Sequence, residues 1–246
     1  GTLAAASIGS HTGQANNLTI SLTGLGGGFS AGSTAGFAKG TANFTMDASN
    51  TEGSLDINKI SASGITISTG TIQNFDTTLI KAGGAFTLDG AASTSGSTSA
   101  SMNIGGITAS AGVTMSLGAG TGQISAGNIH SDNAISIDAS NFGGTLNLPN
   151  MTASGVTISL GLNGNVSSAI VDSGKAFTLD GSAAGSSDIT LGIVDASSNA
   201  TISLGSGTGG LSVGTNISAG GSLVIDGSKS SASMDIFNAS ASGVTV

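Results

Sequence analysis

Five aspartates recur 42 to 49 residues apart and are the residues of this chain that most suggest chemistry. Carboxylate oxygens are the ligands that calcium takes, so the pattern predicts a row of calcium sites. We favour the alternative that these aspartates have a structural role. Calcium takes about six to eight oxygen ligands, and each position offers one carboxylate. An aspartate can also close a turn by accepting backbone N–H bonds, here just before Gly90, Gly181 and Gly227. The five residues are Asp47, Asp89, Asp138, Asp180 and Asp226.

The two histidines give little basis for catalysis. His11 and His130 are 119 residues apart, and a repeat structure would place them in different coils. His130, Ser131 and Asp132 have the residue types of a catalytic triad, but consecutive residues of an extended strand point to opposite sides. The chain has no Trp, Tyr, Arg or Cys, which excludes thiolate metal sites and the aromatic platforms of polysaccharide-cleaving solenoids. We therefore expect no enzyme, and no cofactor other than calcium.

The elements that position these residues form a repeat. Short apolar strands such as 156–160, 177–180 and 200–204 align on a central Thr, with 21 to 27 residues from one to the next. This period is about one solenoid coil. The column reads Thr19, Thr45, Thr66, Thr87, Thr114, Ser136, Thr157, Thr178, Thr201, Val224 and Thr245.

Both neighbours of this column are apolar in every repeat, as a strand with one buried face requires. All 22 positions are apolar in a chain that is 38% apolar, so the pattern is no accident. The first buried column reads Leu18, Phe44, Ile65, Phe86, Val113, Ile135, Val156, Phe177, Ala200, Leu223 and Val244. The second reads Ile20, Met46, Ile67, Leu88, Met115, Ile137, Ile158, Leu179, Ile202, Ile225 and Val246.

Two further short strands fit between successive Thr positions, for example 55–57 and 60–62, which gives each coil three sides. Glycines at the corners are expected to supply the backbone conformations of sharp bends. These corner glycines are Gly64, Gly70, Gly84, Gly90, Gly155, Gly161, Gly181, Gly205 and Gly227. The sequence thus predicts an all-β fold, a right-handed parallel β-helix (β-solenoid) of about eleven triangular coils of about 22 to 23 residues. Residues 1–246 are expected to form a single such segment.

Two residues after the Thr column, serine and aspartate alternate from Ser21 to Asp226 without exception. Aspartates in every coil would lie about 4.8 Å apart and repel by roughly 1 kcal/mol per neighbouring pair even in water. Skipping one coil roughly halves this repulsion. The alternation predicts a super-repeat of two coils.

The net charge of −8 and only five lysines leave no basic stripe, so nucleic acid is not an expected partner. No apolar run approaches the ~20 residues of a membrane span. The Thr column resembles the flat arrays of ice-binding solenoids, although its partner column holds Ser or Asp in place of a second Thr. Thr is also a common residue on an exposed strand because of its β-branching.

The chain also resembles the repetitive shafts of large secreted bacterial proteins, such as filamentous-haemagglutinin-like adhesins, autotransporter passengers and some surface-layer proteins. The Ser-Ala-Ser-Gly-Val-Thr strand at 240–245 and the Phe-Thr-Leu-Asp-Gly corners at 86–90 and 177–181 carry the likeness, which extends over the whole chain. The secretion motif Asn-Pro-Asn-Gly is absent.

This resemblance implies an extracellular structural subunit at the cell surface, a rigid rod or spacer in a surface layer, filament or adhesin shaft. Its expected partners are further coils added end to end, by the same chain or by other copies, and no membrane span is expected. The rival interpretation is a binding solenoid whose Thr/Ser/Asp face holds ice, calcium or a surface glycan.

Overall fold

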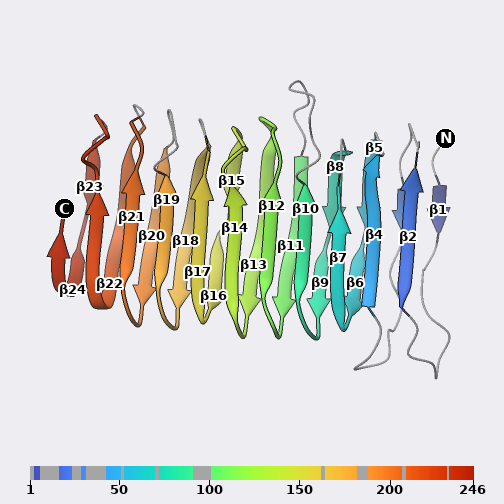
Figure 1. The fold of residues 1–246 in the computed structure, drawn as a ribbon, viewed down its shortest axis with the longest axis horizontal. Helices are drawn as coiled ribbons and strands as arrows, with labels where there is room; N and C mark the ends of the chain where they lie inside the picture. Colours follow the sequence, from blue (N-terminus) through green and yellow to red (C-terminus); the bar gives the residue numbers. More distant parts are fainter. Residues whose placement is uncertain are drawn as a thin grey trace.

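The strands of the Thr column stack into one parallel ladder, which we call the first ladder (Figure 1). The computed structural model describes residues 3–5, 17–23, 29–31, 43–50, 53–69, 72–90, 101–161, 164–181, 188–206, 209–231 and 233–246. The first ladder consists of β2 (Leu18–Thr23), β4 (Asn43–Asn50), β7 (Gly64–Ser68), β10 (Phe86–Gly90), β12 (Val113–Leu117), β14 (Ala134–Ala139), β17 (Gly155–Leu160), β19 (Phe177–Gly181), β21 (Ala200–Leu204), the end of β22 (Leu211–Asp226) and the end of β24 (Ala239–Thr245).

The register of this ladder confirms the predicted columns. Phe44 pairs with Ile65, Val156 with Phe177, and Leu223 with Val244. Every strand pairing in the described residues is parallel, so the predicted stacking of successive coils is confirmed.

Two more ladders form the other sides of the coil. The second ladder consists of β1 (Leu3–Ala5), β3 (Phe29–Ala31), β5 (Gly53–Ile57), β8 (Ile72–Thr77), the first halves of β11 (Ser101–Ala109) and β13 (Gln123–Ser131), β15 (Thr145–Asn147), the first halves of β18 (Asn165–Ser173) and β20 (Ile189–Ala196), the start of β22, and β23 (Met234–Ile236). The third consists of β6 (Lys59–Ala62), β9 (Leu79–Ala82), the second halves of β11 and β13, β16 (Asn150–Ala153), the second halves of β18 and β20, the middle of β22 and the start of β24.

The number of coils differs from the prediction of about eleven. The first and second ladders each hold eleven described strands, but the third holds nine. All three sides are therefore described together over about eight turns. Segments 6–16 and 32–42, which precede β2 and β4, lie outside the described residues.

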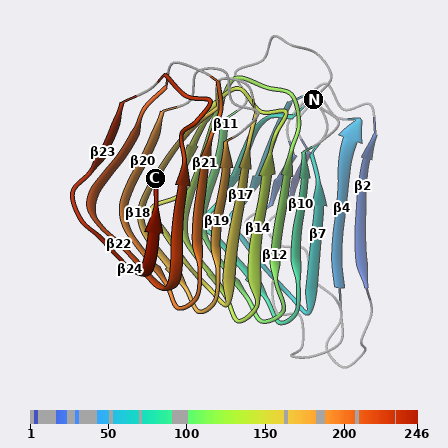
Figure 2. The same ribbon diagram turned by 60° about the vertical axis from the view of Figure 1, so that its left-hand side comes forward.

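The coil is right-handed, as predicted. In Figure 1 the strands of the first ladder run upward at the front, the fainter strands run downward behind them, and each turn advances from the N-terminal towards the C-terminal end. Figure 2 shows the same stack obliquely, with the first ladder separated from the strands behind it. All 24 strands belong to one continuous sheet, and no described residue is helical.

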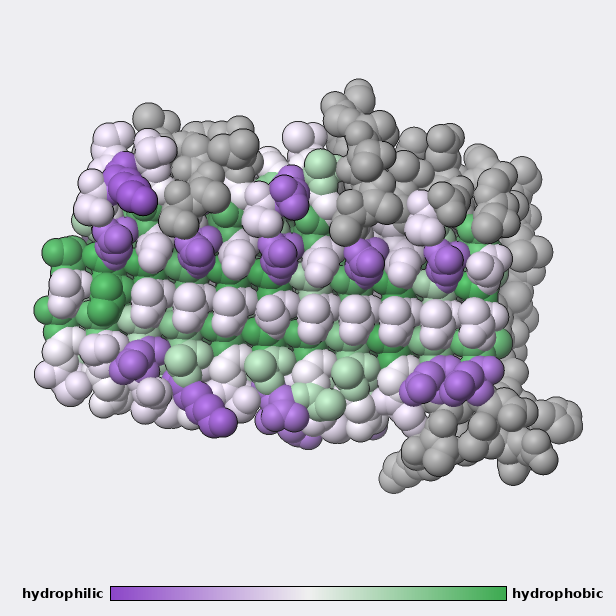
Figure 3. Space-filling view, in the orientation of Figure 1, coloured by the Kyte–Doolittle hydropathy of each residue, from purple (hydrophilic) through white to green (hydrophobic). Residues whose placement is uncertain are grey.

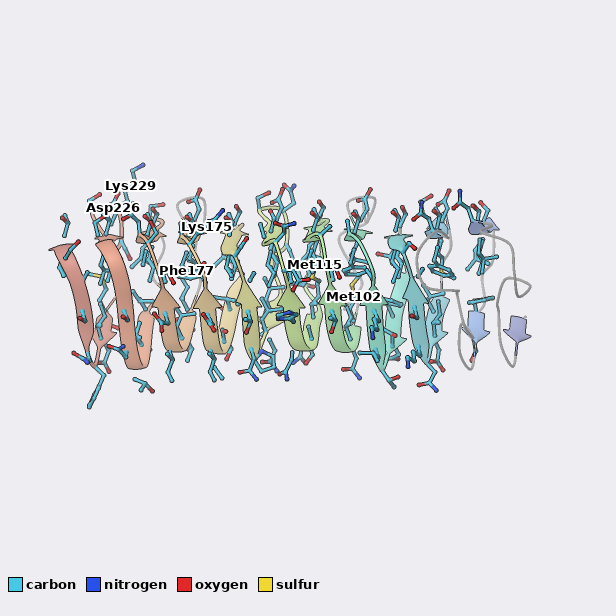
Figure 4. The ribbon with its side chains drawn as sticks, turned by 90° about the horizontal axis from the view of Figure 1, so that it is seen from below. Met102, Met115, Lys175, Phe177, Asp226 and Lys229 are labelled. Carbon is cyan, nitrogen blue, oxygen red and sulfur yellow. The ribbon has the colours of Figure 1, made fainter. Side chains whose placement is uncertain are left out.

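The interior is a stack of apolar side chains. From β4 to β22, every residue of the two predicted columns is at most 1% exposed. Figure 4 shows Phe177 and Met115 inside the stack, whereas Asp226 and Lys229 project from it. Burying each such side chain is worth about 1.5–3 kcal/mol, so the core is the main source of stability.

The two ends of these columns depart from the prediction. Leu18 and Ile20 are only partly buried, while Val244 and Val246 are 52% and 71% exposed. The reason is that a side chain in this fold is covered by the coils on both sides of it, and β24 has a described strand on one side only.

The described corner glycines do not have the positive φ that the prediction expects. Among the described residues, only Gly53 is a glycine with a positive φ, of 135°. At Gly84 and Gly161, a Cβ atom would instead collide with the carbonyl oxygen of Ser63 or Ser140 in the preceding coil. These glycines let one coil approach the next. Gly70 lies outside the described residues.

A Val156→Asp substitution tests the buried column. It would place an unpaired charge between Ile135 and Phe177, and we expect a loss of roughly 3–5 kcal/mol in the free energy of unfolding. Thermal unfolding followed by far-UV circular dichroism would measure it. Thr157→Asp, one residue along on the exposed side, is the control and should cost less than about 1 kcal/mol. Equal effects of the two changes would contradict the burial assignment.

Candidate functional site

The outer face of the first ladder is a regular polar surface. The Thr column is exposed or half-buried along its whole length, and it is in register from Thr19 to Thr245. The alternating Ser/Asp column runs beside it: Asp47 pairs with Ser68, and Ser68 pairs with Asp89. Figure 3 shows a pale central row, with a row above it that alternates between purple and pale. The predicted two-coil super-repeat is therefore present on the surface.

Three aspartates of this column accept a backbone N–H bond, and of these Asp226 precedes one of the three glycines named in the structural interpretation. Each accepts a hydrogen bond from the backbone N–H two residues later: Asp47 from Ser49 at 3.1 Å, Asp138 from Ser140 at 3.0 Å, and Asp226 from Ser228 at 3.0 Å. The Ser49 hydroxyl donates a second bond to Asp47, at 2.6 Å. At these positions the carboxylate fixes the bend that leads out of the first ladder.

These hydrogen bonds favour the charged form of the carboxylate. The side-chain and backbone hydrogen bonds of Ser49 lower the pKa of Asp47 below its ordinary value of 3.8. Hydrogen bonds from Ser228, with a smaller contribution from the charge of Lys229, lower the pKa of Asp226 in the same way. Asp47 and Asp226 therefore stay negatively charged at neutral pH.

The geometry limits how calcium could bind here. Consecutive aspartates are two coils apart, which is about 9.6 Å. Calcium–oxygen distances are about 2.3–2.6 Å, so one ion could not bridge two of these carboxylates. In the described part of the chain, no group of three or more His, Cys, Asp or Glu residues is placed to hold a metal ion. Calcium binding at Asp47, Asp89, Asp138, Asp180 and Asp226 stays a prediction.

A second polar feature lies on the outer face of the second ladder. Asp56 pairs in register with Asp76, so these two carboxylates occupy neighbouring coils without a serine between them. They line an open cavity of about 440 Å³ together with Ser30, Asn58, Thr77, Thr78 and Asn103. The Thr78 hydroxyl donates to the Asn58 side-chain oxygen at 2.7 Å. The cavity is polar and acidic.

The triad residue types do not converge. His130 Nε2 lies 3.3 Å from Asp132 Oδ1 on the exposed surface. Ser131 points inward, is 2% exposed, and its hydroxyl accepts a hydrogen bond from the Asn133 N–H at 3.2 Å. Ser131 therefore points away from the other two side chains, as predicted, whereas His130 and Asp132 lie together on the outer surface. His11 lies outside the described residues.

The inner columns of the second and third ladders were mostly missed by sequence reasoning. A constant spacing of five residues would have revealed them, because the two strands meet at a corner of fixed length. The pairs are Leu55–Ile60, Phe75–Ile80, Met102–Ile107, Ile124–Ile129, Leu146–Met151, Val166–Val171 and Ile189–Val194, and all but Met102 are at most 2% exposed.

Comparison with protein-family models, with curated protein sequences and with solved structures gave no match. The fold assignment therefore stands on the strand pairing described above. Across the described ranges, no helix has the length and apolar character needed to cross a bilayer.

The hydrogen bonds at Asp47 predict a pH effect. Because its folded-state pKa is lowered, this carboxylate stabilises the fold above about pH 3.8 and loses that contribution as the pH falls through the folded-state pKa. In Ser49→Ala the hydroxyl bond is lost, so the pKa should rise back towards 3.8. An NMR pH titration of the side-chain carboxyl carbon measures both values. A wild-type pKa at or above 3.8 would contradict the assignment.

A Ser159→Asp substitution tests the electrostatic reason for the alternation. Ser159 lies between Asp138 and Asp180, so the variant would place three carboxylates in neighbouring coils. We expect a loss of about 2 kcal/mol in the free energy of unfolding at low salt, reduced at high salt. Ser125→Asp is the matched control, because Ser125 lies between Asn103 and Asn147. Denaturant titrations at two salt concentrations would show whether only the first variant depends on salt.

Proposed function

We propose that this chain is a rigid rod or spacer in an extracellular bacterial assembly, such as a surface layer, a filament or an adhesin shaft. The observation that carries the proposal is the stacking of the first ladder, in which the Thr column stays in register through eleven strands. At about 4.8 Å per coil, these strands extend for about 48 Å.

The energetics of the fold suit such a role. Each coil contacts only its neighbours, so stability accumulates along the stack and bending would open hydrogen bonds on one side. The described residues bring no nucleophile, base and electrostatic stabiliser together, which is what a catalytic site would require. The resemblance to secreted bacterial shafts points to the same role and to a location outside the cell.

End-to-end continuation is part of this proposal. Successive coils pair in the same parallel way along the described stack, so further coils, of the same chain or of another copy, could extend it by the same pairing.

A second candidate function is ligand binding by the outer face of the first ladder. The specific observation in its favour is the regular column of Thr hydroxyls, spaced at about 4.8 Å on a flat surface. Ice, calcium and a glycan are the candidate ligands. Thermal hysteresis that disappears in a Thr157→Lys variant would support ice binding.

Negative-stain electron microscopy with and without EDTA tests the scaffold role. We expect straight rods or filaments in both conditions, because the core and the hydrogen-bond ladders hold the stack without metal. Compact or irregular particles would contradict the proposal. One other result would assign calcium to the aspartate column. In that result, wild-type rods collapse in EDTA, whereas rods of the Asp138→Asn variant persist in EDTA.

A further inference from the structure

The outer face of the third ladder carries an uneven distribution of charge. We call its six central strands β9, β11, β13, β16, β18 and β20 the third-ladder face. One outward column along it is in register in every neighbouring pair of coils. That column reads Lys81, Thr108, His130, Thr152, Asp172 and Asp195. Its positive charge lies at one end and its two negative charges lie at the other.

Among the described residues, the charges at the two ends of this column have no ion-pair partner. Asp172 and Asp195 are exposed neighbours in register, and side chains in adjacent coils are about 4.8 Å apart. Lys81 is four and five coils away from them. None of these three residues forms a salt bridge within the described residues. The like-charged pair would be stabilised by a cation brought from outside.

The neighbouring outward column adds an apolar component at the same end of the face. Ile170 pairs in register with Ile193, and Ile170 is 41% exposed. Leu79, at the lysine end, is half-buried, and Gly106 lies next to it without a side chain. Asn128 and Asn150 lie in the middle, where the Asn150 amide donates to the Asn128 oxygen at 2.8 Å.

We propose that two copies of the chain pair through the third-ladder face, with their long axes antiparallel. The two-fold axis lies between β13 and β16, so β9 faces β20 of the second copy and β11 faces its β18. Lys81 of each copy then lies opposite Asp195 of the other, with Asp172 next to it. This arrangement places a lysine on each carboxylate pair, twice by symmetry.

The same arrangement matches the apolar column. Leu79 comes to lie opposite Ile193 of the second copy, and Ile170 comes opposite Gly106, where the missing side chain leaves room. If the second copy were shifted by one coil, so that the two-fold axis lay at β13, Ile193 would lie opposite Lys59. His130 would then lie opposite His130 of the second copy. In that register Lys81 would still lie opposite a carboxylate, that of Asp172, so the apolar column selects the proposed register over the shifted one.

The corners on both sides of the third-ladder face are short, so a second copy can pack flat against this face. From Leu55 to Val244, the buried residue of the second ladder and that of the third ladder are five or six residues apart. The buried residues of the third and first ladders have the same spacing. Measured in the same way, the corner between the first and second ladders is longer, with up to 14 residues from Leu88 to Met102. The patch is about 24 Å by 13 Å, so the pairing is weak and suits chains at high local concentration.

Charge exchange tests the pairing in sedimentation-velocity experiments over a range of protein concentrations. Lys81→Glu and Asp195→Lys should each raise the dissociation constant at least about tenfold, because both symmetric contacts become repulsive. The double variant recreates opposite charges across the interface and should return within about threefold of the wild type. Lys175→Glu, in the corner after β18, is the matched control and should leave association unchanged. Circular dichroism shows whether each variant is folded.

The orientation is tested separately with spin labels, since the chain has no cysteine of its own. Single cysteines at Ser61 and Ser240 lie beyond the two ends of the paired strands. In the antiparallel pair, labels at Ser61 are offset along the axis by about 34 Å and labels at Ser240 by about 43 Å. A parallel pair would give the same separation at both sites.

Three outcomes would overturn the proposal. One is a chain that stays monomeric at millimolar concentration. Another is self-association that Lys81→Glu leaves unchanged, or that the double variant fails to restore. The third is a pair of equal label separations at Ser61 and Ser240. The scaffold proposal would survive all three, because rods seen by microscopy do not depend on lateral pairing.

Discussion

Each residue in this fold lies about 4.8 Å from the equivalent residues of the coils before and after it. Each side chain therefore lies between similar side chains of the two adjacent coils. This constraint decides which side chains can occupy each column. Apolar residues satisfy it inside, where Phe86 packs between Ile65 and Val113. Small hydroxyl residues satisfy it outside, where Thr repeats without charge. The low content of charged residues, 7%, follows from the same constraint, since a charged column would repel itself along its whole length.

The three outer faces handle charge in different ways. On the first ladder, a serine separates each aspartate from the next, and backbone N–H groups stabilise several of these carboxylates. On the second and third ladders, the pairs Asp56–Asp76 and Asp172–Asp195 lie in neighbouring coils. Carboxylates in neighbouring coils are therefore avoided on the first face and present on the other two. The first face is compatible with repetition, whereas the other two hold local concentrations of negative charge that a cation or a second copy would stabilise.

The sequence predicted the first ladder almost completely because apolar residues on both sides of a Thr mark a strand with one buried face. Its register followed from alignment alone, and the structure agrees from Leu18 to Val244. The second and third ladders were harder to predict because their strands are short and merge across a corner, as in β11 and β13. The role of the corner glycines was also assigned wrongly, since the collision that excludes a side chain at Gly161 comes from Ser140, 21 residues earlier. The pairs Asp56–Asp76 and Asp172–Asp195 can be recognised as neighbours only when the register between coils is known. Because the coils differ in length, no local sequence pattern shows this register.

The unequal corners have a consequence for how such a chain can change. Between the second and third ladders, an added residue reverses the inward and outward directions of the side chains that follow it unless a bulge absorbs it, as the register shift in β22 does before Ile217. Between the first and second ladders, the distance already varies from seven residues after Ser68 to 13 after Asp89, while the strands on either side keep their alignment. From β5 to β24, the larger differences in length therefore fall along one edge of the rod, where a grafted foreign peptide would disturb the alignment of the strands least. Successive grafts there would be displayed in a row at the spacing of the coils.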